Sequence, residues 1–113
     1  MRYLHHSLIL VVLIGVAGCA SPPPPRDYTL DRSQLCEVHH IKMTKTIVPI
    51  SYGLPNKKAA DRYIASTNSF PNYASVGGGC MVTKHSPREA FVFVCPECEQ
   101  ARQKWEIEYD KKQ

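Results

Sequence analysis

The sequence lacks a hydrophobic run long enough to cross a membrane. Its main apolar stretch, Leu8 to Val16, is interrupted only by Gly15 and falls well short of the roughly 20 residues that a transmembrane helix needs. The chain also has no nucleophile elbow, no H-E-x-x-H motif and no paired-carboxylate motif. The run Gly77-Gly78-Gly79 lacks the lysine and the following helix of a phosphate loop, which favours a turn or bulge. Catalysis is therefore not indicated.

The sequence has little excess of one charge. It carries 14 Lys and Arg against 10 Asp and Glu over 113 residues, a formal charge of +4, with 43% hydrophobic and 21% charged residues. These values are typical of a folded globular domain. Because basic and acidic residues are interspersed, we expect an ordinary surface and no nucleic-acid partner.

The amino-terminal segment has the features of an export signal. Arg2 supplies a positive charge, and the apolar stretch that follows has the length of a signal-peptide core. Next comes Val16-Ala17-Gly18-Cys19, a branched apolar residue, two small residues and a cysteine. This order resembles the lipobox of bacterial lipoproteins. The alternatives are an ordinary secretory signal with a chance cysteine and an uncleaved anchor.

The lipobox resemblance implies that residues 1–18 are removed. It also implies that Cys19 carries a thioether-linked diacylglycerol and a further acyl chain on its new amino group. Two or more chains anchor a protein stably, whereas one binds reversibly. Ala20 follows the cysteine where an Asp would favour retention, so the resemblance implies the outer membrane, facing the periplasm, with membrane lipid as the partner.

A proline-rich segment follows the predicted anchor. Ser21 precedes four consecutive prolines, which favour an extended polyproline II conformation and a spacer that holds the domain away from the bilayer. A ligand for a proline-binding partner is the rival interpretation. We assign residues 19–29 to the anchor and tether, and 30–113 to one domain. With roughly 85 residues to fold, hydrophobic burial alone leaves a narrow margin, so cross-links or a metal would matter.

The domain is predicted to be α+β, with a small antiparallel sheet, one short helix and a C-terminal helix. Residues 41–51 are rich in β-branched side chains, with Pro49 confining the strand to an edge or bend. Helical periodicity covers 57–67, a loop is expected over 68–72, a strand or hairpin limb over 76–83, a turn over 85–88 and a strand over 90–94. Pro96 and the acids after it mark a helix start, with Cys98, Ala101, Trp105 and Tyr109 on one face.

Four cysteines remain once Cys19 is lipidated. Two short pairs stand out at the two ends of the domain, Cys36-x-x-His39 and Cys95-x-x-Cys98, with the spacing of a tetrahedral zinc site. The pattern resembles treble-clef zinc domains, in which the first pair lies on a turn and the second in the first turn of the closing helix. Structural zinc contributes roughly 10–16 kcal/mol, and His40 or Cys80 are alternative ligands.

Three other uses of these residues stay open. Export to an oxidising compartment favours two disulfides, most simply Cys36–Cys80 with Cys95–Cys98, each worth about 2–4 kcal/mol. The order of an apolar strand, a C-x-x-C motif and a helix also resembles the thioredoxin active site. This resemblance implies a periplasmic thiol-disulfide oxidoreductase. That fold, however, needs more chain after the motif. Cys36, His39 or His40, and Met43 would suit copper or another heavy metal.

A wider set of motifs resembles small uncharacterised bacterial lipoproteins. These motifs are Cys36-x-x-His39, the segment 48–55, Gly78-Gly79-Cys80, and Cys95-Pro96-x-Cys98 with Trp105. The resemblance carries no specific activity. We therefore expect a membrane-anchored lipoprotein whose zinc-stabilised domain serves as a non-enzymatic binding or structural module.

Overall fold

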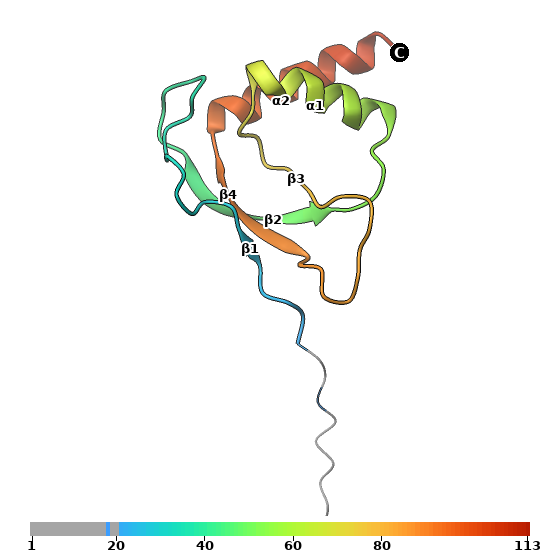
Figure 1. Cartoon of the computed structure of the whole chain (residues 1–113). Helices are drawn as coiled ribbons and strands as arrows, with labels where there is room; N and C mark the ends of the chain where they lie inside the picture. The colour runs from blue at the N-terminus through green and yellow to red at the C-terminus, as the bar shows by residue number, and fades with distance from the viewer. Residues whose placement is uncertain (1–17, 19–20) are drawn as a thin grey trace, which may run out of the picture.

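A computed structural model describes Gly18 and residues 21–113 of the chain. The predicted signal peptide, apart from Gly18, and the predicted lipid site at Cys19 lie outside the described residues. The structure contains β1 (Arg26–Asp27), β2 (Thr44–Ser51), α1 (Lys57–Ser69), β3 (Val76–Gly77), β4 (Glu89–Val94) and α2 (Pro96–Lys111). Figure 1 shows both helices on one side of the sheet, with the proline-rich segment leaving from the opposite end.

The α+β class is confirmed. One four-stranded sheet has the order β1-β4-β2-β3, and its long central pair, β2 with β4, is antiparallel, from Thr44 opposite Val94 to Pro49 opposite Glu89. The two outer pairs, β1 with β4 and β2 with β3, are parallel and only two residues long. The sheet is thus mixed at its edges, and it includes Arg26 and Asp27, which the sequence assigns to the tether.

The position of Pro49 inside β2 follows from its place at a partly open edge. In an antiparallel pair, successive N–H groups point alternately toward and away from the partner strand. The amide of Ile50 donates to the Arg88 carbonyl next to β4, at 2.8 Å. Position 49 therefore faces away from β4, on the side where β3 pairs only from Ile50 onward. No sheet hydrogen bond is lost there, as predicted for an edge.

Both helices begin where the sequence predicts. The side chain of Asn56 accepts a hydrogen bond from the amide of Ala59 at 2.8 Å and caps α1, which continues to Ser69, two residues into the predicted loop. Helix α2 has Pro96 in its first turn and Lys111 in its last turn, as the charge pattern indicates.

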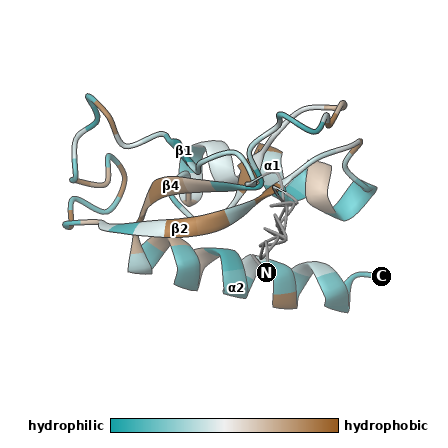
Figure 2. Cartoon of the chain, turned by 90° about the horizontal axis from the view of Figure 1, so that it is seen from below, coloured by the Kyte–Doolittle hydropathy of each residue, from teal (hydrophilic) through white to brown (hydrophobic). Residues whose placement is uncertain are grey.

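The two helices run antiparallel and are joined by ion pairs. Lys58 contacts Asp110 at 2.7 Å, and Arg62 contacts Glu106 at 2.6 Å. These contacts connect the start of α1 with the end of α2. Coloured by hydropathy, α2 is largely hydrophilic, with scattered apolar turns (Figure 2). The contacts between the two helices therefore include at least two ion pairs.

The predicted strand over 76–83 is shorter than expected. Only Val76 and Gly77 pair with β2 as strand residues, although the amide of Gly78 still donates to the carbonyl of Ser51 at 2.8 Å. Gly78 explains the close approach at this point, because a Cβ atom there would lie 2.2 Å from a ring carbon of Tyr52 and 2.6 Å from a methyl of Ile50. A side chain at position 78 would therefore have to displace the Tyr52 ring and the Ile50 side chain.

The core is small and contains the cysteines. The largest fully buried side chains are Phe70, Cys36, Cys95 and Cys98. Trp105 of α2 packs against this cluster, and the rings of Phe70 and Tyr73 form a T-shaped pair at a centroid distance of 5.6 Å. Three thiols thus occupy the position where a domain of this size would otherwise place large aliphatic side chains.

Candidate metal centre

The first ligand pair lies on a tight turn closed by backbone hydrogen bonds. The amide of Cys36 donates to the carbonyl of Ile41 at 2.9 Å, and the amide of His40 donates to the carbonyl of Cys36 at 2.8 Å. An isolated bridge between Leu35 and Lys42 closes the base of the turn. This geometry directs the side chains of Cys36 and His39 to the same side.

The second pair lies where β4 passes into α2. Cys95 is the N-cap residue of the helix, and its sulfur accepts a hydrogen bond from the amide of Cys98 at 3.4 Å. The amide of Cys95 donates to the carbonyl of Asn72 at 2.9 Å, which fixes this junction against the loop after α1. Both cysteines are fully buried. This is the arrangement that the treble-clef resemblance implies for the second pair.

The four side chains converge on one point. Their ligand atoms, three Sγ and His39 Nδ1, all lie within 4.8 Å of one another. The sulfurs of Cys36 and Cys98 are 3.7 Å apart, and His39 Nδ1 lies 3.6, 3.7 and 3.4 Å from the sulfurs of Cys36, Cys95 and Cys98 respectively.

Four of the six separations, those from His39 to each sulfur and from Cys36 to Cys98, are close to the edges of a zinc tetrahedron. With Zn–S near 2.3 Å and Zn–N near 2.0–2.1 Å, tetrahedral geometry places two sulfurs about 3.8 Å apart and a sulfur and a nitrogen about 3.6 Å apart. A disulfide would instead bring two sulfurs to about 2.05 Å. The four residues therefore form a Cys₃His cluster that could hold a metal ion, as the spacing of the two pairs predicts.

Hydrogen-bond donors favour the charged form of one thiol. Burial acts to raise the pKa of Cys36, but the amide of His39 and the side-chain amide of Asn72 donate toward the sulfur and lower its pKa to about 6. Asn72 Nδ2 lies 3.5 Å from this sulfur and 2.7 Å from a carboxylate oxygen of Glu37. The carboxylate holds the amide in the orientation that directs its N–H groups at the thiolate.

The environment of Cys98 has the opposite effect. Burial raises its pKa to about 12, and the neighbouring thiols of Cys36 and Cys95 act in the same direction. The pocket therefore favours the thiolate of Cys36 and disfavours that of Cys98, because negative charges crowd a dry site. A dication held by these residues would remove this conflict, because it would compensate the negative charge of the thiolates.

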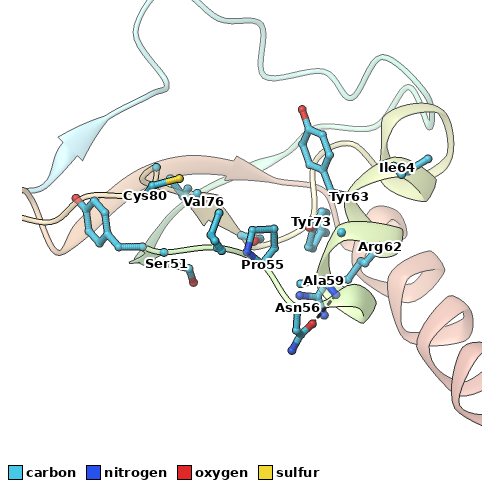
Figure 3. Close-up of a pocket in the computed structure, with 17 residues that line it drawn as sticks. Ser51, Pro55, Asn56, Ala59, Arg62, Tyr63, Ile64, Tyr73, Val76 and Cys80 are labelled. Carbon is cyan, nitrogen blue, oxygen red and sulfur yellow. Dashed lines mark hydrogen bonds between the residues drawn. The ribbon is translucent and has the colours of Figure 1, made fainter.

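The alternative ligands lie outside the cluster. His40 follows His39 with a positive φ of 55°, so the chain turns at this residue, and its side chain is not part of the group of ligand atoms. Cys80 is exposed and lies on the wall of a separate groove (Figure 3). Cys36, Cys80, Cys95 and Cys98 are all free thiols among the described residues, so neither disulfide of the simplest pairing is formed.

The groove that contains Cys80 runs between the end of β2, the start of α1 and β3. Its volume is about 670 Å³, and Leu54, Tyr63 and Val76 are among the apolar side chains that line it. Figure 3 shows Cys80 beside Val76 and away from the helix side of the groove. The groove is distinct from the cysteine cluster.

Sequence reasoning did not identify Asn72 or Glu37 as part of the site. Asn72 is 7% exposed and contacts a ligand that lies 36 residues earlier in the chain. Its only local signal is its place beside Pro71 in a loop, which is compatible with any turn asparagine. Contacts made over this sequence distance leave no pattern in a single sequence.

A scan against protein-family models, a search of curated proteins and a search of solved structures each found no match. Among the residues that the structure describes, no helix combines the length and apolar character needed to cross a membrane. The function must therefore be inferred from the cluster and from the motifs around it.

Proposed function

We propose that this protein is a bacterial lipoprotein, exported and then anchored through lipid on Cys19. Its domain is a non-enzymatic binding or structural module closed by one zinc ion. The observation that carries the zinc assignment is the convergence of Cys36, His39, Cys95 and Cys98, with four of the six separations close to tetrahedral edges. Four protein ligands leave no open coordination position, which is the mark of a structural rather than a catalytic zinc site.

The role of the metal would be to connect the two ends of the domain. Cys36 and His39 precede the first long strand, whereas Cys95 and Cys98 begin the last helix. A metal bound by all four residues would supply stability that the small apolar core does not provide. The same four residues account for the burial of three thiols in the centre of the fold.

Burial opposes the oxidoreductase alternative. A catalytic thiol has to reach its substrate and has a depressed pKa. Cys95 and Cys98 are both fully buried, so neither thiol is open to a protein substrate. The copper alternative receives some support, because Met43 is buried in the same cluster as the cysteines and thioether sulfur is a soft ligand.

Metal analysis of the protein purified without added zinc tests the assignment. We expect about one zinc per chain and three thiols that resist alkylation until a chelator is added, with Cys80 reacting at once. Copper in place of zinc would favour the metal-carrier alternative. A metal-free protein with a Cys95–Cys98 disulfide would contradict the proposal.

Metabolic labelling with a radioactive fatty acid tests the anchor separately. Cys19→Ser should abolish incorporation of the label, because the thiol that accepts the diacylglyceryl group is gone. Cys80→Ser is the matched control and should be labelled like the unchanged protein. Label that persists in Cys19→Ser would refute the anchor and leave the metal assignment untouched.

A further inference from the structure

The loop over residues 78–88 combines exposed apolar and basic side chains. It joins β3 to β4. Met81 is 81% exposed and Val82 is 63% exposed, and Lys84, His85 and Arg88 are exposed as well. Lys84 and Arg88 form no ion pair with any residue in the described part of the chain. An apolar tip flanked by unpaired cations is the chemistry of a surface that meets an anionic lipid interface.

Hydrogen bonds hold this loop in place. At its start, the amide of Gly53 donates to the carbonyl of Gly79 at 2.8 Å, and near its end the hydroxyl of Tyr52 donates to the carbonyl of Pro87. Between these points the amide of Thr83 donates to the hydroxyl of Ser86 at 2.9 Å. The exposed apolar side chains are therefore presented by an ordered turn.

The proline-rich segment lies against the same surface. Ser21 and the four prolines that follow share a groove of about 600 Å³ with Lys84, Arg88 and Glu89. Figure 1 shows that the loop between β3 and β4 and the departing segment lie at the same end of the molecule, opposite the C-terminus. The segment thus runs along the basic loop.

Covalent geometry then places the loop close to the predicted lipid site. Cys19 is two residues before Ser21, and consecutive Cα atoms are about 3.8 Å apart, so the two Cα atoms are separated by less than about 8 Å. A diacylglyceryl group on Cys19 puts that residue at the membrane interface. The start of the segment that borders the loop then lies at or near the lipid headgroups.

We propose that the loop of residues 78–88 docks on the anionic bilayer leaflet that holds the acyl chains of Cys19. Met81 and Val82 enter the interface, and Lys84 and Arg88 face lipid phosphates. This inference rests on the proposed lipid anchor. It differs from the expectation that the prolines hold the domain away from the bilayer, because the docked face lies directly beside them.

Fluorescence of the full-length lipidated, metal-loaded protein tests docking. The exposed Cys80 is adjacent to Met81, whereas the other three thiols are buried, so an environment-sensitive maleimide dye can be placed at Cys80 alone. The labelled protein is reconstituted into vesicles of phosphatidylethanolamine and phosphatidylglycerol, and vesicle flotation reports on the anchor independently. The control carries the dye at the opposite end, in a Gln113→Cys, Cys80→Ser variant.

Docking predicts that the Cys80 dye shifts to the blue and is quenched by nitroxide-bearing lipids, while the Gln113→Cys dye stays unchanged. Lys84→Gln and Arg88→Gln should each lower the ratio of docked to undocked protein about fivefold, as expected for about 1 kcal/mol per basic side chain near an anionic surface. Met81→Ser should reduce the blue shift, and vesicles of phosphatidylcholine alone should give a weaker signal.

Two results would overturn the proposal, and they differ from each other. If the protein floats with the vesicles but the Cys80 dye behaves like the control dye, the anchor stands and the docking is refuted. If the lipidated protein does not float, the anchor fails, and the docking fails with it.

Discussion

Replacing Cys98 by serine removes one of the four proposed metal ligands from the centre of the core. Only seven hydrophobic residues are buried in the described structure, and three of them are the cysteines of the cluster. A domain of this size has a total stability of about 5–15 kcal/mol, and a structural zinc contributes energy of the same order. We therefore expect Cys98→Ser to lower the free energy of unfolding by more than about 4 kcal/mol, the range reached when a metal site is lost.

Thermal unfolding followed by circular dichroism, and by the fluorescence of Trp105, measures this loss. Trp105 packs against the cluster, so its emission reports on the same region. The matched control is Cys80→Ser, which removes an exposed thiol and should change stability by less than about 0.5 kcal/mol. A chelator should lower the melting temperature of the unchanged protein and of the control, but not that of Cys98→Ser. Equal melting temperatures for the two variants would refute the role of the metal.

Three further predictions concern the surroundings of the site. Asn72→Ala should weaken zinc binding about 10–100-fold, as measured by competition with a chromophoric chelator. Asn68→Ala, at an exposed position, should not change the affinity. Equal affinities for the two variants would contradict a role of the Asn72 amide in supporting the site. Gly78→Ala should lower the free energy of unfolding in urea by about 1–3 kcal/mol, because its Cβ meets a tyrosine ring. Gly77→Ala has open space around it and should lower it much less. Similar losses for the two variants would contradict the close contact between Gly78 and Tyr52. Burial acts to raise the pKa of Glu106, but its arginine partners lower the pKa below its usual value. The stabilisation from these ion pairs is present above the unfolded pKa and is lost as the pH falls, so Glu106→Gln should lower the free energy of unfolding by about 1 kcal/mol at neutral pH and by progressively less on acidification. A loss that does not change with pH would exclude the ion pairs as its cause.

The convergence of the two C-x-x-[HC] pairs and the closing helix could be predicted because their signals are local. A C-x-x-[HC] pair places two ligands on one turn, and the proline and acids at the start of α2 mark a helix wherever they occur. The β-branched run of β2 is equally local. Each of these elements appears in the structure at or near the predicted residues.

Other features depend on contacts between distant segments. Strands β1 and β3 are two residues long, too short for any periodicity, and they exist only because longer strands offer an edge. Cys80, directly after the three glycines, was an alternative metal ligand in the sequence. In the structure, the close approach at Gly78 is instead to Ile50 and Tyr52.

Which of the two adjacent histidines joins the cluster also depends on the backbone conformation, which the sequence does not reveal. Both lie near Cys36 in the sequence, and spacing alone allows either. His40 adopts a positive φ and its amide closes the turn onto Cys36, which leaves His39 directed at the sulfurs.

X-ray absorption at the zinc edge of the purified protein tests the central claim most directly, because it counts and identifies the ligands. We predict three sulfur ligands at about 2.3 Å and one nitrogen ligand at about 2.0 Å, with the spectrum unchanged in Cys80→Ser and His40→Ala. A zinc ion bound by oxygen and nitrogen alone, or a folded protein that retains no metal, would contradict the account.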